Sequence, residues 1–124
     1  MKKSFLVFSL FIITAMSYSE ITDVQERGGF AVVYGDNGRE ITRRSLGDNT
    51  LVGVTKSFFV FQNEYSIILY NEQGKEISRM PSEYRKVKNA VGETFSVEEH
   101  GKWIVTYDKN CKMVSKKNKK KNKV

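Results

Sequence analysis

The sequence predicts an all-β fold in which a short antiparallel meander is repeated about three times. One motif recurs at a nearly constant spacing after residue 20. Runs rich in aromatic and β-branched residues, which favour strands, alternate with clusters of Gly, Asn and Asp, which favour turns. No segment after residue 20 carries the apolar period of a helix. These observations are compatible with an extended meander sheet, a small sandwich, or part of a closed ring of sheets.

The repeated motif reads Tyr-x-x-x-Gly-basic-x-Ile and begins at Tyr34 and at Tyr70. A third copy begins at Tyr107, with Cys111 at the glycine position and a valine at the isoleucine position. The tyrosines lie 36 and 37 residues apart. The eighth position after each tyrosine holds a hydroxyl side chain: Thr42, Ser78 and Ser115. We extend the match upstream to the valines that lie ten residues before each tyrosine: Val24, Val60 and Val97.

Turn signals divide each copy into strands. The predicted strands are 22–25, 30–34 and 39–43; 51–55, 57–62, 65–70 and 75–79; and 87–91, 94–98, 102–107 and 112–115. The third strand of a full copy, such as Tyr65–Tyr70, is apolar on both faces, so we expect cover on both sides. The last strand of a copy, such as Arg39–Arg43, is mostly charged and suits an exposed edge.

A four-stranded meander of this length, with the motif at Tyr34 and Tyr70, resembles the blade repeats of bacterial β-propeller-type proteins. The resemblance implies antiparallel blades that stack on one another. Propellers usually have four to eight blades, whereas this chain has at most three. We therefore expect a partial propeller or a small sheet or sandwich, with self-association into a homodimer as one way to complete a ring.

The N-terminus has the three-part pattern of a secretory signal over residues 1–19. An apolar run, Phe5–Ala15, follows two lysines, and Ser17 and Ser19 supply small residues for cleavage before Glu20. A membrane anchor is the alternative, but a run of this length spans only about half of a bilayer core. We expect an exported protein, periplasmic or secreted, with a β-repeat domain over 20–115 whose copies cover about 20–44, 50–80 and 86–116.

The positive charge of the chain lies at its ends. Residues 20–111 carry 12 basic and 14 acidic residues, whereas residues 112–124 carry seven lysines and no acid. The sequence therefore predicts no specific nucleic-acid binding by the folded domain. It predicts a disordered, Lys-rich tail over 116–124, which is either a solvated extension or a charged contact to an anionic polymer or surface. Candidate binding residues are the tail lysines and two aromatics that the repeat does not require: Phe59, Tyr65, Lys116, Lys117, Lys119, Lys120, Lys121 and Lys123.

Neither a catalytic motif nor a set of metal ligands is present in the sequence. His100 is the single histidine and precedes a glycine, so we interpret it as a solvated turn residue rather than a general base. Cys111 is the single cysteine, and it is either a tolerated substitution in a turn or an exposed thiol that pairs between chains. We predict no catalytic residues, no metal and no cofactor.

The function that these features favour is an exported, non-enzymatic binding or interaction module of the bacterial envelope. Its ligand would be another envelope protein or an anionic polymer. The alternatives are a small envelope enzyme or inhibitor-like domain with an unrecognised site, and a surface anchor that acts through the charge of its tail.

Overall fold

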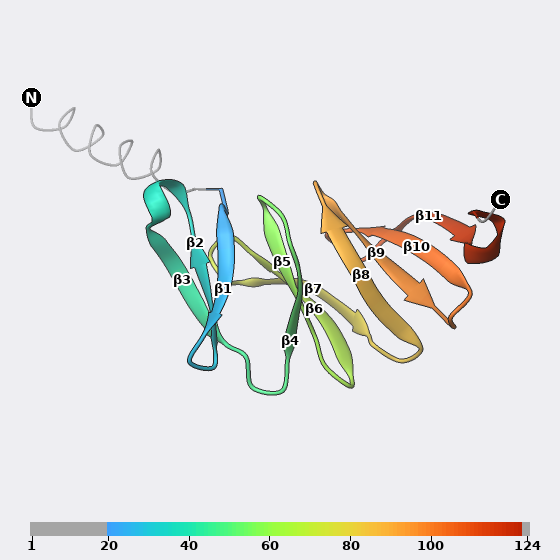
Figure 1. The fold of residues 1–124 in the computed structure, drawn as a ribbon, viewed down its shortest axis with the longest axis horizontal. Helices are drawn as coiled ribbons and strands as arrows, with labels where there is room; N and C mark the ends of the chain where they lie inside the picture. The colour runs from blue at the N-terminus through green and yellow to red at the C-terminus, as the bar shows by residue number, and fades with distance from the viewer. Residues whose placement is uncertain (1–19, 123–124) are drawn as a thin grey trace, which may run out of the picture.

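A computed structural model describes residues 20–122, which form eleven strands and two short 3-10 turns (Figure 1). The predicted signal segment and Lys123 lie outside the described residues. Each sheet is an antiparallel meander of consecutive strands, and the all-β prediction is confirmed. Among residues 20–122, no helix is long and apolar enough to cross a membrane.

The three sheets correspond to the three copies of the motif. The first contains β1 (Asp23–Arg27), β2 (Phe30–Tyr34) and β3 (Glu40–Ser45), with the turn η1 (Asp36–Gly38) between the last two. The second contains β4 (Thr50–Val54), β5 (Phe58–Gln62), β6 (Ser66–Asn71) and β7 (Glu76–Pro81). The third contains β8 (Arg85–Val91), β9 (Thr94–Glu99), β10 (Trp103–Asp108) and β11 (Met113–Asn118), followed by η2 (Lys119–Asn122).

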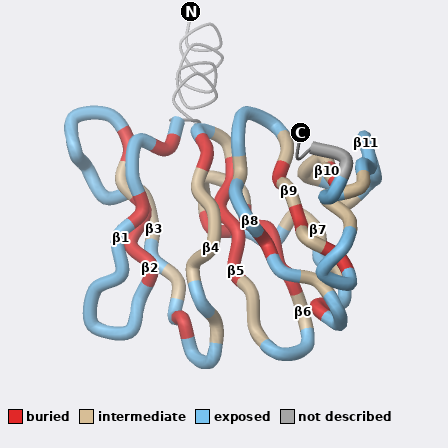
Figure 2. Tube along the Cα trace, turned by 45° about the vertical axis from the view of Figure 1, so that its right-hand side comes forward, coloured by how far each residue is buried: buried red, intermediate tan, exposed pale blue. Residues whose placement is uncertain are grey.

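The sheets stack face to face and enclose two apolar cores, one on each side of the second sheet. The first four residues of β5 are all buried, because alternate side chains of the strand point into different cores. Phe59 and Phe61 pack toward the first sheet, and Phe58 and Val60 pack toward the third. Figure 2 shows the buried residues concentrated along these central strands. The continuous apolar run of β5 is thus explained by cover on both faces.

The two end faces of the stack are more polar than the faces between sheets. On the free face of the first sheet, Asp23 opposes Tyr34, whereas the buried Phe59 opposes Tyr70 in the second. On the free face of the third sheet, the hydroxyls of Ser96 and Thr106 lie 3.3 Å apart. The expectation of apolar cover on both sides therefore holds for the second sheet alone among the described residues. Polar outer faces are typical of the terminal units of stacked repeats.

The upstream part of the predicted repeat is wrong in the third copy. Val60 pairs with Leu69 and points away from the side of Tyr70, whereas Val97 pairs with Val105 and shares the face of Tyr107. The reason is the parity of the connection: four residues separate the last paired residues of β5 and β6, and three separate those of β9 and β10. A change of one residue in a connection exchanges the two faces of a strand. The equivalent residues are those that oppose the motif tyrosines: Asp23, Phe59 and Phe95.

A repeated contact sets the register between neighbouring sheets. The glycine turn of the second sheet lies against the first sheet, where a Cβ added to Gly74 would be 3.1 Å from the Thr42 side chain. At the equivalent place in the next pair of sheets, the Cys111 sulfur lies 3.3 Å from the Ser78 hydroxyl. The turns of the second and third sheets thus each seat on the hydroxyl residue of the preceding sheet. This contact accounts for the hydroxyl at the eighth position of the motif.

The C-terminal segment departs from the disordered tail that the sequence predicts. Lys116, Lys117 and Asn118 belong to β11 and pair with Val105, Ile104 and Trp103 of β10. Backbone pairing with an ordered neighbour does not depend on apolar side chains, so a lysine-rich segment can complete a sheet at its edge.

Candidate binding surface

Three connections meet at one end of the second and third sheets and bring aromatic and basic side chains together. The Ser82 amide donates a hydrogen bond to the Tyr65 carbonyl at 3.0 Å, which joins the β7–β8 connection to the β5–β6 turn. The His100 amide donates to the Tyr84 carbonyl at 2.9 Å, which joins it to the β9–β10 turn. We call this surface the aromatic–basic edge and define it by six residues: Tyr65, Tyr84, His100, Lys102, Trp103 and Lys116.

Two rings of the aromatic–basic edge stack on each other. The rings of Tyr84 and His100 have centroids 4.0 Å apart and planes 10° apart. Both residues have a φ of 55°, a left-handed conformation that costs energy for a residue with a side chain. The guanidinium of Arg85 lies 4.6 Å from the centroid of the Tyr84 ring and donates a hydrogen bond to the Tyr84 hydroxyl at 3.1 Å. These contacts hold an exposed aromatic surface in one arrangement.

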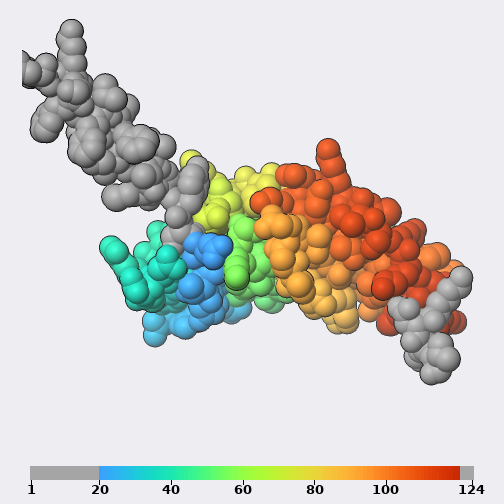
Figure 3. Space-filling view, turned by 90° about the horizontal axis from the view of Figure 1, so that it is seen from above, coloured from blue at the N-terminus to red at the C-terminus, as the bar shows by residue number. Residues whose placement is uncertain are grey.

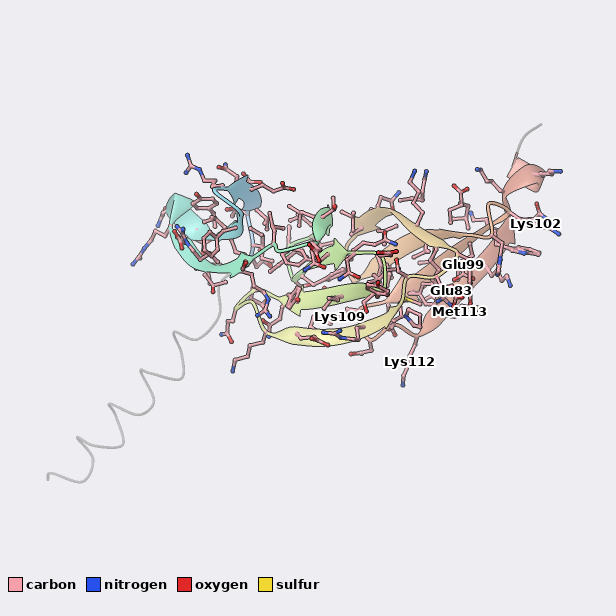
Figure 4. All side chains as sticks on the ribbon, turned by 90° about the horizontal axis from the view of Figure 1, so that it is seen from below. Glu83, Glu99, Lys102, Lys109, Lys112 and Met113 are labelled. Atoms are coloured by element: carbon pink, nitrogen blue, oxygen red, sulfur yellow. The ribbon has the colours of Figure 1, made fainter. Side chains whose placement is uncertain are left out.

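The indole of Trp103 forms the second part of the edge. Its half-buried ring packs on the core between the second and third sheets. The Lys116 ammonium lies 4.6 Å from the ring centroid, and that of Lys102 lies at 5.5 Å. Cation–π attraction keeps both exposed ammonium groups beside the ring. Figure 4 shows Lys102 at the C-terminal end of the molecule, well apart from Lys112.

A buried polar network supports the edge from below. Glu99 accepts hydrogen bonds from the Tyr107 hydroxyl and, at 2.9 Å, from the Arg85 Nε. Burial by itself raises the pKa of Glu99, but the hydrogen bonds from Tyr107 and Arg85 outweigh burial and hold that pKa below its usual range. Burial, and then the bond to Glu99, raise the pKa of Tyr107 to about 12. The network therefore fixes Arg85, and through it the Tyr84 ring.

A groove of about 550 Å³ runs beside the edge, between β4 and β8. Its walls combine both signs of charge, with Glu64 and Asp48 on one side and Arg85 and Lys86 on the other. Gln62 is held there by hydrogen bonds to the Ser82 hydroxyl and the Arg85 carbonyl. The groove thus offers fixed polar groups next to the aromatic rings.

The structure separates the two aromatic residues that the sequence suggested for binding. Phe59 has no exposed surface and packs against Phe61 and Tyr70, so it is a core residue. Tyr65 is 78% exposed at the β5–β6 turn and belongs to the aromatic–basic edge.

The described lysines among the predicted binding residues lie at the C-terminal end of the chain, and only Lys116 of them belongs to the aromatic–basic edge. Lys116 and Lys117 project from β11, and Lys119 and Lys120 begin η2. The Lys119 ammonium forms an ion pair with Glu98 at 3.2 Å. Lys121 lies within η2, and Lys123 lies outside the described residues.

Sequence reasoning did not assign Tyr84, Lys102 or Trp103 to a site. Trp103 falls on a strand that also supplies the core, which favoured a packing role. The tyrosine and the lysine lie in connections whose contacts depend on the stacking of sheets. Among residues 20–122, no three histidine, cysteine or acidic side chains are grouped so that they could hold a metal ion.

The single histidine, His100, and the single cysteine, Cys111, have local structural roles. His100 is exposed in its turn and stacks on Tyr84. Cys111 has a φ of 63°, as the glycine position of the turn demands, and its half-buried thiol contacts Ser78. Burial raises the pKa of this thiol, which lowers its reactivity as a thiolate. The geometry agrees with a tolerated substitution in the turn.

Comparisons with known proteins find likeness in the fold alone. No protein-family model matches the chain, and no curated protein is significantly similar to it. Among solved structures, BamB from Moraxella catarrhalis superimposes with a TM-score of 0.52 at 16% sequence identity. The match covers 77% of this chain and 34% of that one, so the chain spans about a third of the length of its structural neighbour. Because BamB is a β-propeller-type protein, the resemblance to propeller blades is confirmed.

Proposed function

We propose that this protein is an exported, non-enzymatic binding module of the bacterial envelope whose aromatic–basic edge binds an anionic polysaccharide. The observation that carries the proposal is the indole of Trp103 flanked by Lys102 and Lys116, beside the stacked rings of Tyr84 and His100. The secretory pattern of residues 1–19 supports export. The propeller-like stack of sheets supports a binding role, since such folds present their connections as a continuous surface.

The ligand class follows from the chemistry of the edge. The exposed rings of Tyr65 and His100 offer flat apolar surfaces to the faces of sugar rings, while ammonium groups attract carboxylate or phosphate groups. The Tyr84 ring lies against His100 and Arg85 and supports this surface. The rings of Tyr84 and His100 are already held by stacking and backbone hydrogen bonds, so binding costs little conformational entropy there. An acidic polysaccharide uses both features, whereas an acidic polypeptide uses mainly the charge.

The test compares two polyanions of similar charge density, polygalacturonate and polyglutamate, by calorimetry with the full chain. We expect tighter binding of polygalacturonate and a steep loss of affinity for both with rising salt. Lys116→Glu should weaken binding by about fivefold or more, since one lysine near an anionic surface contributes ~1 kcal/mol. Trp103→Leu should weaken polygalacturonate binding by about 30-fold, the effect of a central aromatic contact.

Lys112→Glu is the matched control, because this exposed lysine lies in the β10–β11 connection at the opposite end of the strands. It makes the same change in net charge and should leave affinity within about twofold once salt screens distant charges. Equal losses for Lys112→Glu and Lys116→Glu would mean that net charge alone attracts the polymer. Equal affinity for the two polyanions would remove the polysaccharide assignment.

A further inference from the structure

The contact that joins neighbouring sheets consists of a turn and a hydroxyl residue, and each end of the stack presents one of these two parts without the other. Three copies of the motif provide three turns and three hydroxyl residues, and two turn–hydroxyl pairs form within the chain. The Gly38 turn of the first sheet is not seated on a hydroxyl residue: within residues 20–122, a Cβ added at Gly38 would meet nothing within 4 Å. Ser115 on β11 is the unused hydroxyl residue, and it is exposed. Figure 3 shows the first and third sheets at opposite ends of the molecule.

We infer that a second copy of this chain docks end to end, with its Gly38 turn seated on Ser115 in the register of the contacts within the chain. The inference goes beyond the proposed ligand and is independent of it.

At its glycine position the unused turn has the conformation of the two that are seated. Gly38, Gly74 and Cys111 have φ values of 69°, 78° and 63°. In each turn the amide of the residue at the glycine position donates a hydrogen bond to the carbonyl three residues earlier. These bonds run from Gly38 to Gly35, from Gly74 to Asn71 and from Cys111 to Asp108. The residue before the glycine position differs, since Asn37 has a φ of 63° whereas Gln73 and Asn110 do not have a positive φ. The likeness of the first turn to the seated turns therefore holds at the glycine position and its hydrogen bond.

The receiving face keeps the other half of the contact. Thr42, Ser78 and Ser115 pair with Val33, Leu69 and Thr106, so the three hydroxyl residues occupy the same place and face in their sheets. Two positions beyond Thr42, the Arg44 guanidinium donates to the Gly74 carbonyl at 2.8 Å and lies 4.3 Å from the centroid of the Tyr70 ring.

Lys117 holds the Arg44 position in the third sheet and is exposed. In the docked pair its ammonium would reach the Gly38 carbonyl and the Tyr34 ring of the second copy. The third sheet therefore retains both a hydroxyl and a cation for an incoming turn.

The polarity of the end faces sets the strength of this contact. Asp23 and Gln25 on one face, and Ser96 and Thr106 on the other, stand where the inner faces carry apolar side chains. The apolar part of the incoming face that remains accessible is Phe30 and the half-buried Tyr34, since Val32 is already buried within the chain. Such a surface suits a weak, reversible and concentration-dependent contact. Because the two faces differ, the contact is head to tail, and each pair keeps one free end of each kind.

Disulfide trapping tests the register directly. Cys111 shows that this turn position accepts cysteine, with its sulfur 3.3 Å from the hydroxyl of its partner. In the full chain carrying Cys111→Ser, the pair Gly38→Cys and Ser115→Cys should therefore form a disulfide between copies under mild oxidation. The pair of Ser78→Cys with the native Cys111 is the positive control and should form a disulfide within one chain.

The mismatched control is Gly28→Cys with Ser115→Cys in the same background. Gly28 is an exposed glycine of positive φ in the other turn of the first sheet, so it carries the same strain and reacts by random collision alone. We expect the Gly38 pair to crosslink at least tenfold faster than the Gly28 pair, and Lys117→Glu to slow it severalfold. Equal rates for the two pairs would overturn the proposed register, provided that circular dichroism shows both variants folded.

Discussion

Replacing Arg85 by methionine should destabilise the protein more than any loss of a surface ion pair. The side chains of Arg85 and Glu99 are only 14% and 9% exposed. Removing one partner of a buried pair leaves the other charge uncompensated, at a cost of about 3–5 kcal/mol. The residual exposure of Glu99 admits some water, so we expect a loss of about 2–4 kcal/mol in the free energy of unfolding at pH 7. Urea denaturation measures this difference.

The pH dependence identifies the cause of that loss. Because the pKa of Glu99 is lowered in the folded state, its ion pair stabilises the protein above the unfolded carboxyl pKa. This contribution disappears as pH falls through the folded pKa. The difference between wild type and Arg85→Met should therefore shrink in acid.

The matched control is Arg79→Met. Arg79 also pairs with a glutamate, at 2.7 Å, but these side chains are 53% and 38% exposed. An exposed pair contributes at most about 1 kcal/mol. Equal losses for the two variants, or a loss at Arg85 that does not change with pH, would refute the role assigned to the buried pair.

Three further substitutions probe other parts of the fold, and one measurement probes the N-terminus. Since the pKa of Tyr107 is raised to about 12, its contribution is complete below pH 10 and is lost as pH rises through 12; Tyr107→Phe should flatten the alkaline limb of a stability–pH curve. Gly74→Ala should cost at least about 1 kcal/mol more than Gly38→Ala in urea denaturation, because both have positive φ but only the first side chain meets a neighbouring sheet. Cys111→Gly should change stability by less than about 1 kcal/mol, since relief of positive φ offsets the lost thiol contact; a larger loss would show that packing of the sulfur dominates. Intact-mass spectrometry of the exported product should find an N-terminus within two residues of Glu20, and retention of Met1 would disprove signal cleavage.

The strands and their grouping could be predicted from sequence because local signals and the repeat agree. In the second copy, the apolar run of β5 and the Asn71–Gly74 turn both mark strand boundaries, and the tyrosine spacing fixes the period. Faces were harder to assign. The alignment of Val97 with Val60 assumed equal connections, and one residue of difference reversed the face. Phe59 was misjudged as a binding residue for this reason, since its true counterpart is the buried Phe95 rather than Ser96.

The aromatic–basic edge could be predicted only in part. Tyr65 is a candidate because the repeat does not require an aromatic residue there, and the lysines of β11 are candidates because the C-terminal segment holds seven lysines and no acid. Tyr84 lies directly before β8 and His100 directly after β9, so no local pattern pairs them, and their stacking accompanies a backbone hydrogen bond between the two connections. The composition of the C-terminal segment also predicted disorder for Lys116 and Lys117, because composition carries no information about the strand, β10, with which these residues pair.

The second sheet contributes residues to both apolar cores, whereas the first and third sheets each contribute to one core. Opening of an end sheet exposes one core, whereas opening of the second sheet exposes both. Amide hydrogen exchange should therefore be graded along the chain, slowest in β5 and β6 and faster in β1 and β11. A destabilising change in either core then reaches the other through the same strands, so thermal unfolding is coupled across all three sheets even though the first and third enclose no core between them.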